Sequence, residues 1–259
     1  MIVIETVLVA FAMFSAIPLP QPDWNENNMR YTLCAFPLVG LVCGALWWGW
    51  GTLCTYFNAQ HLLRGAGLCL IPVLVTGGIH LDGFADTCDA LASCASPEKK
   101  QEILKDPRCG AFAVIRLCSY FAAYFALCSA LQTTSKAFWC MGLAFVLERS
   151  LSGLAITRFP LAKNTGLAHA FAAAADRRRA GQILMLECVL AGAGMIAAGG
   201  VTGIVMAAVG LLVFRRYRVV ADRQFGGLSG DLAGWFLQRA ELWMLGALTV
   251  CQLLEAKLL

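Results

Sequence analysis

The stretch YTLCAFPLVGLVCGALWWGWGTLCTYF, from Tyr31 to Phe57, contains no charged side chain. A helix of about 20 predominantly apolar residues crosses a bilayer, so this stretch predicts a transmembrane helix. The whole chain has the same character, because 59% of its 259 residues are hydrophobic and only 14% are charged. Its mean hydropathy is +0.69. So few polar side chains cannot cover a soluble globule, and the composition predicts an all-α polytopic membrane protein.

The other apolar runs predict the number of crossings. Further candidate helices lie at Ile2–Ile17, Gly65–Ile79, Cys109–Leu131, Lys136–Thr157, Gln182–Ala198, Val201–Phe214 and Leu242–Leu254. Three of them, including the first and the last, are short for a crossing. The run from Gly181 to Phe214 exceeds one crossing, and the glycine pair of AAGGV is the natural place for a turn. We predict a helical bundle of about seven to eight transmembrane helices that forms one membrane-embedded domain over residues 1–259.

The basic residues predict the orientation of this bundle. With alternating spans, most of the 20 Lys and Arg residues fall on one side of the membrane, many of them in the segments 96–108 and 158–179. The opposite side receives only Arg64, Lys136 and Lys257. The positive-inside rule makes the basic side cytoplasmic and places both termini on the other side. This topology accounts for the net charge of +4, so no nucleic-acid partner is expected.

The twelve cysteines do not form a recognisable site. Most are scattered through apolar runs, without a CxxC motif and without zinc-like spacing to histidine. We interpret them as small buried hydrophobic residues, and those near the cytoplasm as reduced thiols.

The stretch GGIHLDGFADTCDAL, from Gly77 to Leu91, contains three closely spaced aspartates. On a helix with about 100° per residue, Asp86 lies ~40° and Asp89 about −20° from Asp82, so the three share one face. Three neighbouring carboxylates repel one another unless some are protonated or a cation lies among them. A donor set made only of oxygens favours a hard cation. Mg²⁺ is the first candidate, because it usually binds one or two carboxylates together with a phosphate.

Two neighbours bear on this cluster. Gly83 leaves one side of the helix bare, so a ligand can approach the backbone there. His80 lies ~160° from Asp82 on a continuous helix, and it joins the site only if TGGI forms a turn that re-aims it. The alternatives are an interfacial role for His80 and a solvated acidic helix start for the aspartates, which the helix dipole would favour. The apolar neighbours and the membrane boundary favour a functional cluster, because unused acids are disfavoured there.

A short helix is predicted in SPEKKQEILKDPRCG. Ser96 is its expected N-cap, Pro97 occupies the first helical position, and Pro107 closes it. Its end carries the charged residues Lys105, Asp106 and Arg108. The two cations are either topology anchors or donors to phosphate oxygens, for which a guanidinium is well shaped. The Asp-Pro-Arg turn favours the phosphate interpretation.

A second glycine-aspartate element is GGLSGDLAGWFLQRAEL, from Gly226 to Leu242. A helix from Asp231 puts Gln238 on nearly the same face and Glu241 about 80° away. Because this element is predicted on the same side as the first aspartates, the two could close one site. Glu148 and Arg149 fall inside a predicted span, where each costs about 2.5–3.5 kcal/mol on insertion scales. They are therefore expected to face a polar interior or each other.

These motifs together resemble one family. GGIHLDGFADTCDAL, followed by KDPRCG and later by GGLSGD, resembles the cobalamin synthase family, also called adenosylcobinamide-GDP ribazoletransferases. FPLVGLVCG from Phe36 and TGLAHAF from Thr165 are similar to the same family, so the resemblance covers most of the chain. It implies a Mg²⁺-dependent enzyme of the bacterial inner membrane whose active site faces the cytoplasm. Such an enzyme joins adenosylcobinamide-GDP to α-ribazole or its 5′-phosphate and releases GMP.

The resemblance also implies roles for particular residues. The implied catalytic residues are Asp82, Asp86, Asp89 and His80. Those implied at the substrate phosphates are Lys105, Arg108, Gly83 and Gly230. The implied metal ligands are Asp82, Asp86, Asp89, Asp106, Asp231 and Glu241. Three positions depart from the family pattern, namely Ala90 for glycine, Ser229 for threonine and Gln238 for glutamate. The last removes one possible acidic ligand and weakens the case for a metal role of that helix beyond Asp231 and Glu241.

Two other functions fit part of the sequence. A membrane CDP-alcohol phosphotransferase also uses an aspartate motif, but LDGFADTCD lacks the Ala-Arg step and the wider spacing of that motif. A cation transporter, the alternative outside enzymes, predicts acids deep in several spans, whereas the densest acids here lie at one membrane face. Either an isolated chain or a homo-oligomer is compatible with the sequence.

Overall fold

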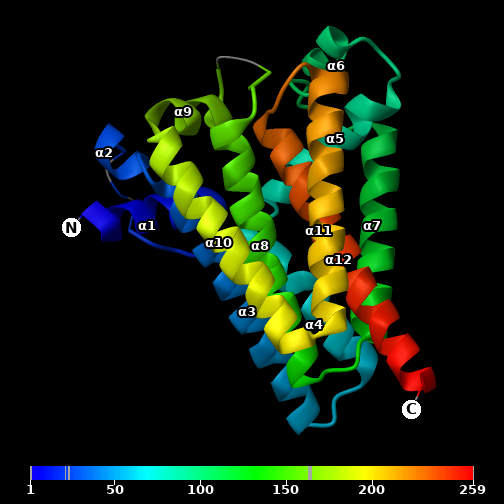
Figure 1. Ribbon diagram of the computed structural model, residues 1–259. Helices are drawn as coiled ribbons and strands as arrows, with labels where there is room; N and C mark the ends of the chain where they lie inside the picture. The colour runs from blue at the N-terminus through cyan, green and yellow to red at the C-terminus, as the bar shows by residue number, and fades with distance from the viewer. Residues whose placement is uncertain (1, 21, 23, 163–164, 259) are drawn as a thin grey trace.

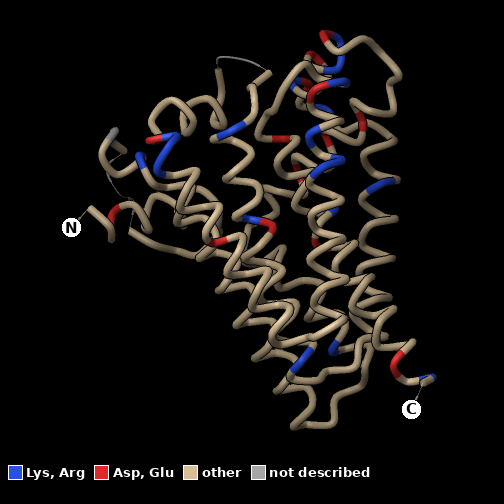
Figure 2. The backbone as a smooth tube through the Cα atoms, viewed as in Figure 1, with Lys and Arg blue, Asp and Glu red and all other residues tan. Residues whose placement is uncertain are grey.

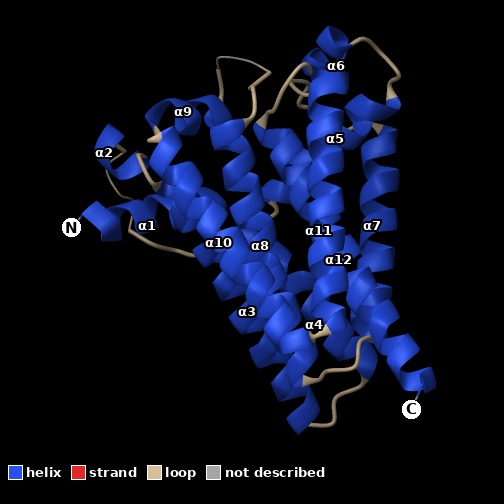
Figure 3. Ribbon diagram, viewed as in Figure 1, coloured by secondary structure: helices blue, strands red, loops and turns tan. Residues whose placement is uncertain are grey.

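The computed structural model describes residues 2–20, 22, 24–162 and 165–258, and this part of the chain is helical, without a β-strand (Figures 1 and 3). The α-helices are α1 (Ile2–Phe14), α2 (Glu26–Met29), α3 (Thr32–Tyr56), α4 (His61–Thr76), α5 (Ile79–Ala92), α6 (Pro97–Ile103), α7 (Ala111–Ala130), α8 (Ser135–Arg158), α9 (Leu167–Ala174), α10 (Arg177–Gly199), α11 (Val201–Val220) and α12 (Gly230–Leu258). A single π-helical turn, η1 (Ala221–Phe225), follows α11. The predicted all-α class is confirmed.

Four helices of the described chain are long and apolar enough to cross a membrane, namely α3, α7, α8 and α10. The pair α4 and α5 adds a fifth crossing if it is counted as one broken span. The other long helices are more polar. α11 ends with Arg215, Arg216 and Arg218, and α12 contains Asp231, Arg239 and Glu241. The structure thus supports a membrane-spanning bundle of four to five apolar helices, a smaller number than the sequence predicted.

Two predicted boundaries have instructive outcomes. The division at the glycine pair is confirmed, because α10 ends at Gly199 and Gly200 has a φ of 56°, which favours glycine. The sequence predicted a helix from Asp231 and, separately, a last span at Leu242–Leu254, and the structure joins the two, because α12 runs without a break from Gly230 to Leu258. No proline lies between Asp231 and Leu242, and the glycine there, Gly234, packs against the backbone of His80. The polar residues Gln238 and Glu241 are buried rather than expelled.

Small residues let α3 and α8 pack closely. A Cβ on Gly44 would lie 2.8 Å from the Cα of Gly142, and a Cβ on Gly40 would collide with the backbone of Phe145. Apolar side chains gain little from packing against each other instead of lipid, so close backbone approach is a common source of helix association in membranes. The Gly40 and Gly44 pair therefore fixes where these two helices cross.

A sharp turn separates α4 from α5. Gly77 and Gly78 have φ values of 66° and 81°, and the axes of the two helices differ by 94°. The left-handed backbone that this turn requires costs glycine no steric strain. α5 is therefore not a continuation of α4, and with 14 residues it is too short to cross a bilayer by itself.

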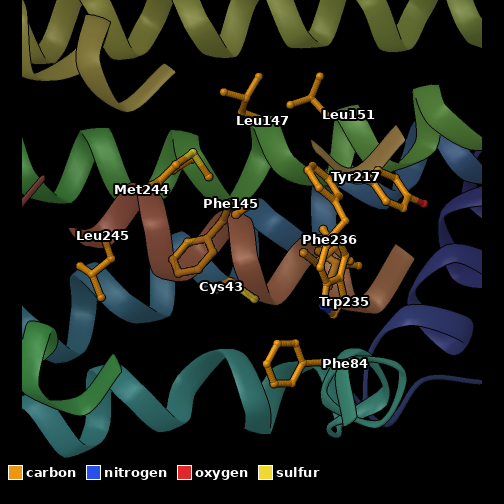
Figure 4. Packing of buried hydrophobic residues seen from close by; sticks show 14 of the residues in the cluster. Cys43, Phe84, Phe145, Leu147, Leu151, Tyr217, Trp235, Phe236, Met244 and Leu245 are labelled. Atoms are coloured by element: carbon orange, nitrogen blue, oxygen red, sulfur yellow. The ribbon is translucent and has the colours of Figure 1, made fainter. Parts of the chain in front are cut away.

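α12 lies against several other helices and contributes much of the core. Met244, Leu245 and Phe236 of α12 are fully buried, as are Phe145 of α8 and Cys43 of α3 (Figure 4). The rings of Phe236 and Tyr217 stack with centroids 4.8 Å apart and link α12 to α11. This packing holds the start of α12, which carries Asp231, against α5.

Charged residues are unevenly distributed along the bundle. Figure 2 shows most Lys and Arg residues toward the end that carries α6, with only a few at the opposite end, where α12 finishes. At that sparse end, Lys136 pairs with Glu255 at 2.6 Å and ties α8 to α12. The two ends of the bundle thus differ strongly in positive charge.

Candidate active site

The predicted helix for the aspartates is confirmed, since Asp82, Asp86 and Asp89 all lie on α5. Asp82 is exposed, while Asp86 and Asp89 are half-buried. Burial, followed by the charges of Asp82, Asp231 and Asp89, raises the pKa of Asp86 to about 6. Asp231 comes from α12, so the glycine-aspartate element adds to the negative field around α5, as the sequence predicted.

The close crossing of α5 and α12 joins these elements. A Cβ on Gly83 would lie 2.8 Å from the Cα of Asp231, and a Cβ on Gly234 would lie 2.7 Å from the carbonyl oxygen of His80. Two glycines, one from each helix, thus allow the backbones to touch. Gly83 was predicted to admit a ligand to the helix backbone, but in the structure the α12 backbone occupies that side.

Two cavities meet at Asp231. The first, which we call the apolar chamber, has a volume of about 330 Å³ and is lined by His80, Asp82 and Asp231 on its polar side. Its other walls include Phe14, Phe36 and Phe171. The second, the polar chamber, has a volume of about 260 Å³. Its polar lining comprises Gln101, Lys105, Thr165, His169, Ser229 and Asp231. Gly230 and Asp231 of α12 line both chambers, as do Leu167 and Ala168 of α9, and these four residues form the common boundary.

A third cavity lies beside the aspartate face of α5. This open cleft of about 560 Å³ is lined by Asp82, Asp86, Pro107 and Cys109. Asp82 lines both the open cleft and the apolar chamber. Its carboxylate therefore stands where two cavities adjoin.

Asp89 is held differently from the other two aspartates. Its carboxylate lies directly against Gly110, and a Cβ on Gly110 would collide with it. Gly110 is the N-cap of α7 and has an extended backbone with a φ of −81°. Glycine at this position therefore provides the space that Asp89 occupies.

Metal binding can be judged from the donor atoms. Within the described ranges, no three His, Cys, Asp or Glu side chains converge closely enough to hold a metal ion by themselves. The three aspartates thus share a helix face without forming a closed cage. Mg²⁺ needs only one or two carboxylates when a diphosphate and water complete its octahedron. The oxygen donors Asp82, Asp86 and Asp231 fit such a shared site, and Mg²⁺ binding stays a prediction.

A turn before α5 re-aims His80, which is the condition predicted from the sequence for this residue to join the site. The Gly77–Gly78 turn is present, and it directs the buried His80 toward the apolar chamber. Burial, aided by the charge of Arg149, lowers the pKa of His80 to about 3, so the imidazole is neutral. Its ring centroid lies 5.6 Å from that of Phe36, and its Nδ1 has no hydrogen-bond partner among the described residues.

The short helix α6 begins as predicted but ends earlier. Ser96 caps it by accepting a hydrogen bond from the amide of Lys99, and Pro97 is its first residue. The prediction that Pro107 ends the helix after Asp106 is wrong, because α6 ends at Ile103 and residues 104–105 form a turn. Asp106 instead caps the turn by accepting the amide of Arg108 at 3.0 Å.

Arg108 and Asp106 pair with each other. The Nε and Nη2 atoms of Arg108 donate to the two carboxylate oxygens of Asp106 at 2.9 and 2.8 Å. This pairing holds the pKa of Asp106 down to about 2. Both side chains face solvent, and Asp106 is not among the acids that act on Asp86. Lys105, in contrast, lines the polar chamber next to Asp231.

Glu241 lies apart from the aspartates. It is about 15 Å along the helix axis from Asp231, at ~1.5 Å per residue. Arg149 lies 2.5 Å from Glu148 and 3.5 Å from Glu241, and all three side chains are buried. The expectation that Glu148 and Arg149 face each other is confirmed. The structure gives Glu241 a partner in this buried ion cluster and does not bring it to α5.

His169 was not singled out from the sequence. It lies on α9, is half-buried and lines the polar chamber with Lys105 and Asp231. The signal was present in TGLAHAF, where Gly166, with a φ of 88°, introduces a helix. A sequence alone could not show that this helix lies beside a motif more than sixty residues away.

Known proteins are similar to this chain over most of its length. A family described as Cobalamin-5-phosphate synthase matches residues 6–249. A protein of Lachnoclostridium phytofermentans named adenosylcobinamide-GDP ribazoletransferase is 41% identical over 245 residues, covering 92% of this chain and 91% of its own. Proteins of the same name from Clostridium botulinum and a Geobacillus species are 31% and 30% identical, covering 95% and 92% of this chain and 96% and 92% of their own. No solved structure matches the chain.

Proposed function

Since the chain belongs to the cobalamin-5-phosphate synthase family, we propose that it is an adenosylcobinamide-GDP ribazoletransferase that completes its reaction at the crossing of α5 and α12. The enzyme joins the lower ligand in the final step of cobalamin synthesis. In this reaction a hydroxyl of α-ribazole, or of its 5′-phosphate, attacks the phosphate that carries the cobinamide, and GMP leaves.

The observation that carries the proposal is the position of Asp231 between two chambers. One chamber has aromatic walls and the carboxylate of Asp82, and the other has the cation of Lys105. The aromatic side suits the flat apolar base of α-ribazole. The polar side suits the phosphates of the nucleotide, because a lysine ammonium commonly donates hydrogen bonds to phosphate oxygens. The two substrates would then meet at the Asp231 boundary.

Displacement at a diphosphate depends mainly on in-line positioning and on neutralising charge on the phosphoryl oxygens. Lys105 supplies one positive charge from the polar chamber. Arg108 supplies another only if it leaves Asp106, which makes the exposed Asp106–Arg108 pair an exchangeable contact. When bound at Asp82, Asp86 and Asp231, Mg²⁺ supplies the remaining positive charge at the diphosphate.

Proton transfer and water exclusion fall to other groups. The attacking hydroxyl must lose its proton, and a carboxylate of the α5 face accepts it within hydrogen-bond reach. The neutral His80 packs on Phe36 and holds the inner wall of the apolar chamber. His169 lines the polar chamber together with Lys105, so its imidazole is on the side where we place the nucleotide.

Membrane placement is part of the proposal. We infer a multi-pass protein of the bacterial inner membrane, with seven to eight crossings and with the α6 end facing the cytoplasm. The uneven distribution of Lys and Arg in Figure 2 supports this orientation through the positive-inside rule. α11 and α12, with 20 and 29 residues, are long enough to raise the four to five apolar crossings to six or seven, and the shorter apolar helix α1 is the candidate for one more.

Release of GMP tests the proposal directly. Detergent-solubilised protein is supplied with adenosylcobinamide-GDP, α-ribazole and Mg²⁺, and GMP is quantified by chromatography. The proposal predicts GMP that appears only when both substrates are present. GMP formation that ignores α-ribazole would indicate hydrolysis instead, and cation flux through reconstituted protein without GMP release would indicate a transporter.

A further inference from the structure

A groove with two arginines lies on the opposite side of α5 from the aspartates. It has a volume of about 370 Å³, and we call it the arginine groove. Arg116 of α7 and Arg239 of α12 line it together with Phe84 of α5 and Trp235 of α12. Around the α5 helix, Phe84 lies ~200° from Asp82 at about 100° per residue, so α5 separates this groove from the aspartate face.

The groove has positive charge that no acid neutralises. No Asp or Glu lines it, and the charged side chains of its lining are Arg116 and Arg239. The Nε of Arg239 is buried and has no hydrogen-bond partner within the part of the chain described. Its guanidinium lies over the Trp235 ring, 4.9 Å from the centroid. Two cations held this close, without a carboxylate, favour an anionic occupant.

Some arginines elsewhere in the protein pair with carboxylates. Arg108 pairs with Asp106, and Arg218 lies 3.7 Å from Asp222. Neither Arg116 nor Arg239 has such a contact among the described residues. What sets these two apart is that they line one cavity together, and that Arg239 is half-buried there.

The groove opens on the outer surface of the bundle. Trp243, on its rim, is 53% exposed, and on α7 the neighbouring apolar residue Ile115 is 56% exposed. In a membrane these side chains contact lipid. Arg116 lies only about 8 Å along α7 from its first residue, at ~1.5 Å per residue. This depth suits an arginine that extends toward the head-group level at the basic end.

We propose that the arginine groove binds the phosphate of an anionic phospholipid. Guanidinium groups match phosphate with paired hydrogen bonds, and basic pockets between transmembrane helices are suited to anionic head groups. The acyl chains would lie along the apolar exposed surface of α7 and α12. This site is separate from the aspartate face, and the inference does not depend on the proposed reaction.

Native mass spectrometry of the full-length protein tests the site. The protein is released from detergent micelles titrated with phosphatidylglycerol or with phosphatidylcholine, and the retained lipids are counted. We expect wild-type protein to retain phosphatidylglycerol in preference to phosphatidylcholine. The double variant Arg116→Gln/Arg239→Gln should bind phosphatidylglycerol at least about tenfold more weakly, because it loses two charged hydrogen-bonding partners.

Three comparisons make the result decisive. Arg178→Gln removes an exposed arginine from α10, outside the groove, and should leave binding unchanged. Arg116→Lys/Arg239→Lys keeps the charge and should retain most of the affinity. If the double Gln variant fails to fold, the single variant Arg116→Gln, at an exposed position, is measured in its place. Equal phosphatidylglycerol affinity in wild-type and Arg116→Gln/Arg239→Gln protein would overturn the proposal. The proposal would also be overturned if the Gln substitutions weakened binding of inorganic phosphate but left phosphatidylglycerol binding unchanged. The bound anion would then be free phosphate.

Discussion

Gly83 of α5 lies against the backbone of Asp231 on α12, so that a Cβ at position 83 would come within 2.8 Å of the Asp231 Cα and carbonyl oxygen. This contact is the point at which the two aspartate motifs of the chain meet. It makes the distance between the motifs depend on the absence of a single side chain.

Replacing this glycine should therefore separate the two motifs. We expect Gly83→Ala to lower the free energy of unfolding by about 1–3 kcal/mol, because the added methyl group meets backbone that cannot move aside easily. GMP release should fall as well, since Asp231 is displaced from Asp82. The matched control is Gly192→Ala, a helical glycine with nothing within 4 Å of an added Cβ. Wild-type stability and turnover in Gly83→Ala would contradict the close crossing.

Asp231 should be essential because it lines both chambers. We expect Asp231→Asn to reduce the rate of GMP release by about 10²–10³, the usual cost of removing one positioned electrostatic group. Asp222→Asn serves as the control, because Asp222 is exposed and lies near Arg218 rather than in a chamber. A rate within a few-fold of wild type in Asp231→Asn would show that this boundary is not where the substrates meet.

Dependence on a divalent cation follows from the oxygen-only donor set. After dialysis against EDTA, GMP release should cease, and Mg²⁺ should restore it, because carboxylates and phosphates are hard ligands. A zinc-selective chelator should have no effect, since no three His, Cys, Asp or Glu side chains of the described residues converge on a metal position. Full turnover in EDTA would show that Lys105 and Arg108 neutralise the phosphates alone.

The buried ion cluster should act on stability. Arg149→Met leaves Glu148 and Glu241 in the interior without a cation, and breaking such a buried cluster costs about 3–5 kcal/mol. Thermal unfolding in detergent should show the loss, and Glu148→Gln/Arg149→Met/Glu241→Gln should recover part of it. If Arg149→Met were as stable as wild type but had lost its response to Mg²⁺, Glu241 would belong to the metal site and not to this cluster.

The long apolar helices α3, α7, α8 and α10 could be predicted from apolar runs, because the bilayer sets the length of a crossing. The turn at Gly77–Gly78 and the break at Gly200 could also be predicted, since both depend on local backbone freedom. The continuity of the helix from Asp231 with the last span could not, because its polar residues Gln238 and Glu241 are buried by partners from distant segments.

The same distinction holds for the site. The shared face of Asp82, Asp86 and Asp89 follows from helix geometry and needed no tertiary information. The position of Glu241 beside Arg149, and of His169 beside Lys105, arises from packing between helices far apart in the chain. No local spacing rule contains that information.

The account rests most directly on the carboxylate of Asp82, which lines both the open cleft and the apolar chamber. The decisive measurement is the rate of GMP release by Asp82→Asn in detergent, beside Glu98→Gln as a control from the exposed helix α6. The variant keeps the size of the side chain and removes one charge from a crowded anionic face. We predict that Asp82→Asn remains folded and loses activity by orders of magnitude, while Glu98→Gln matches wild type. Wild-type GMP release from folded Asp82→Asn protein would contradict the account.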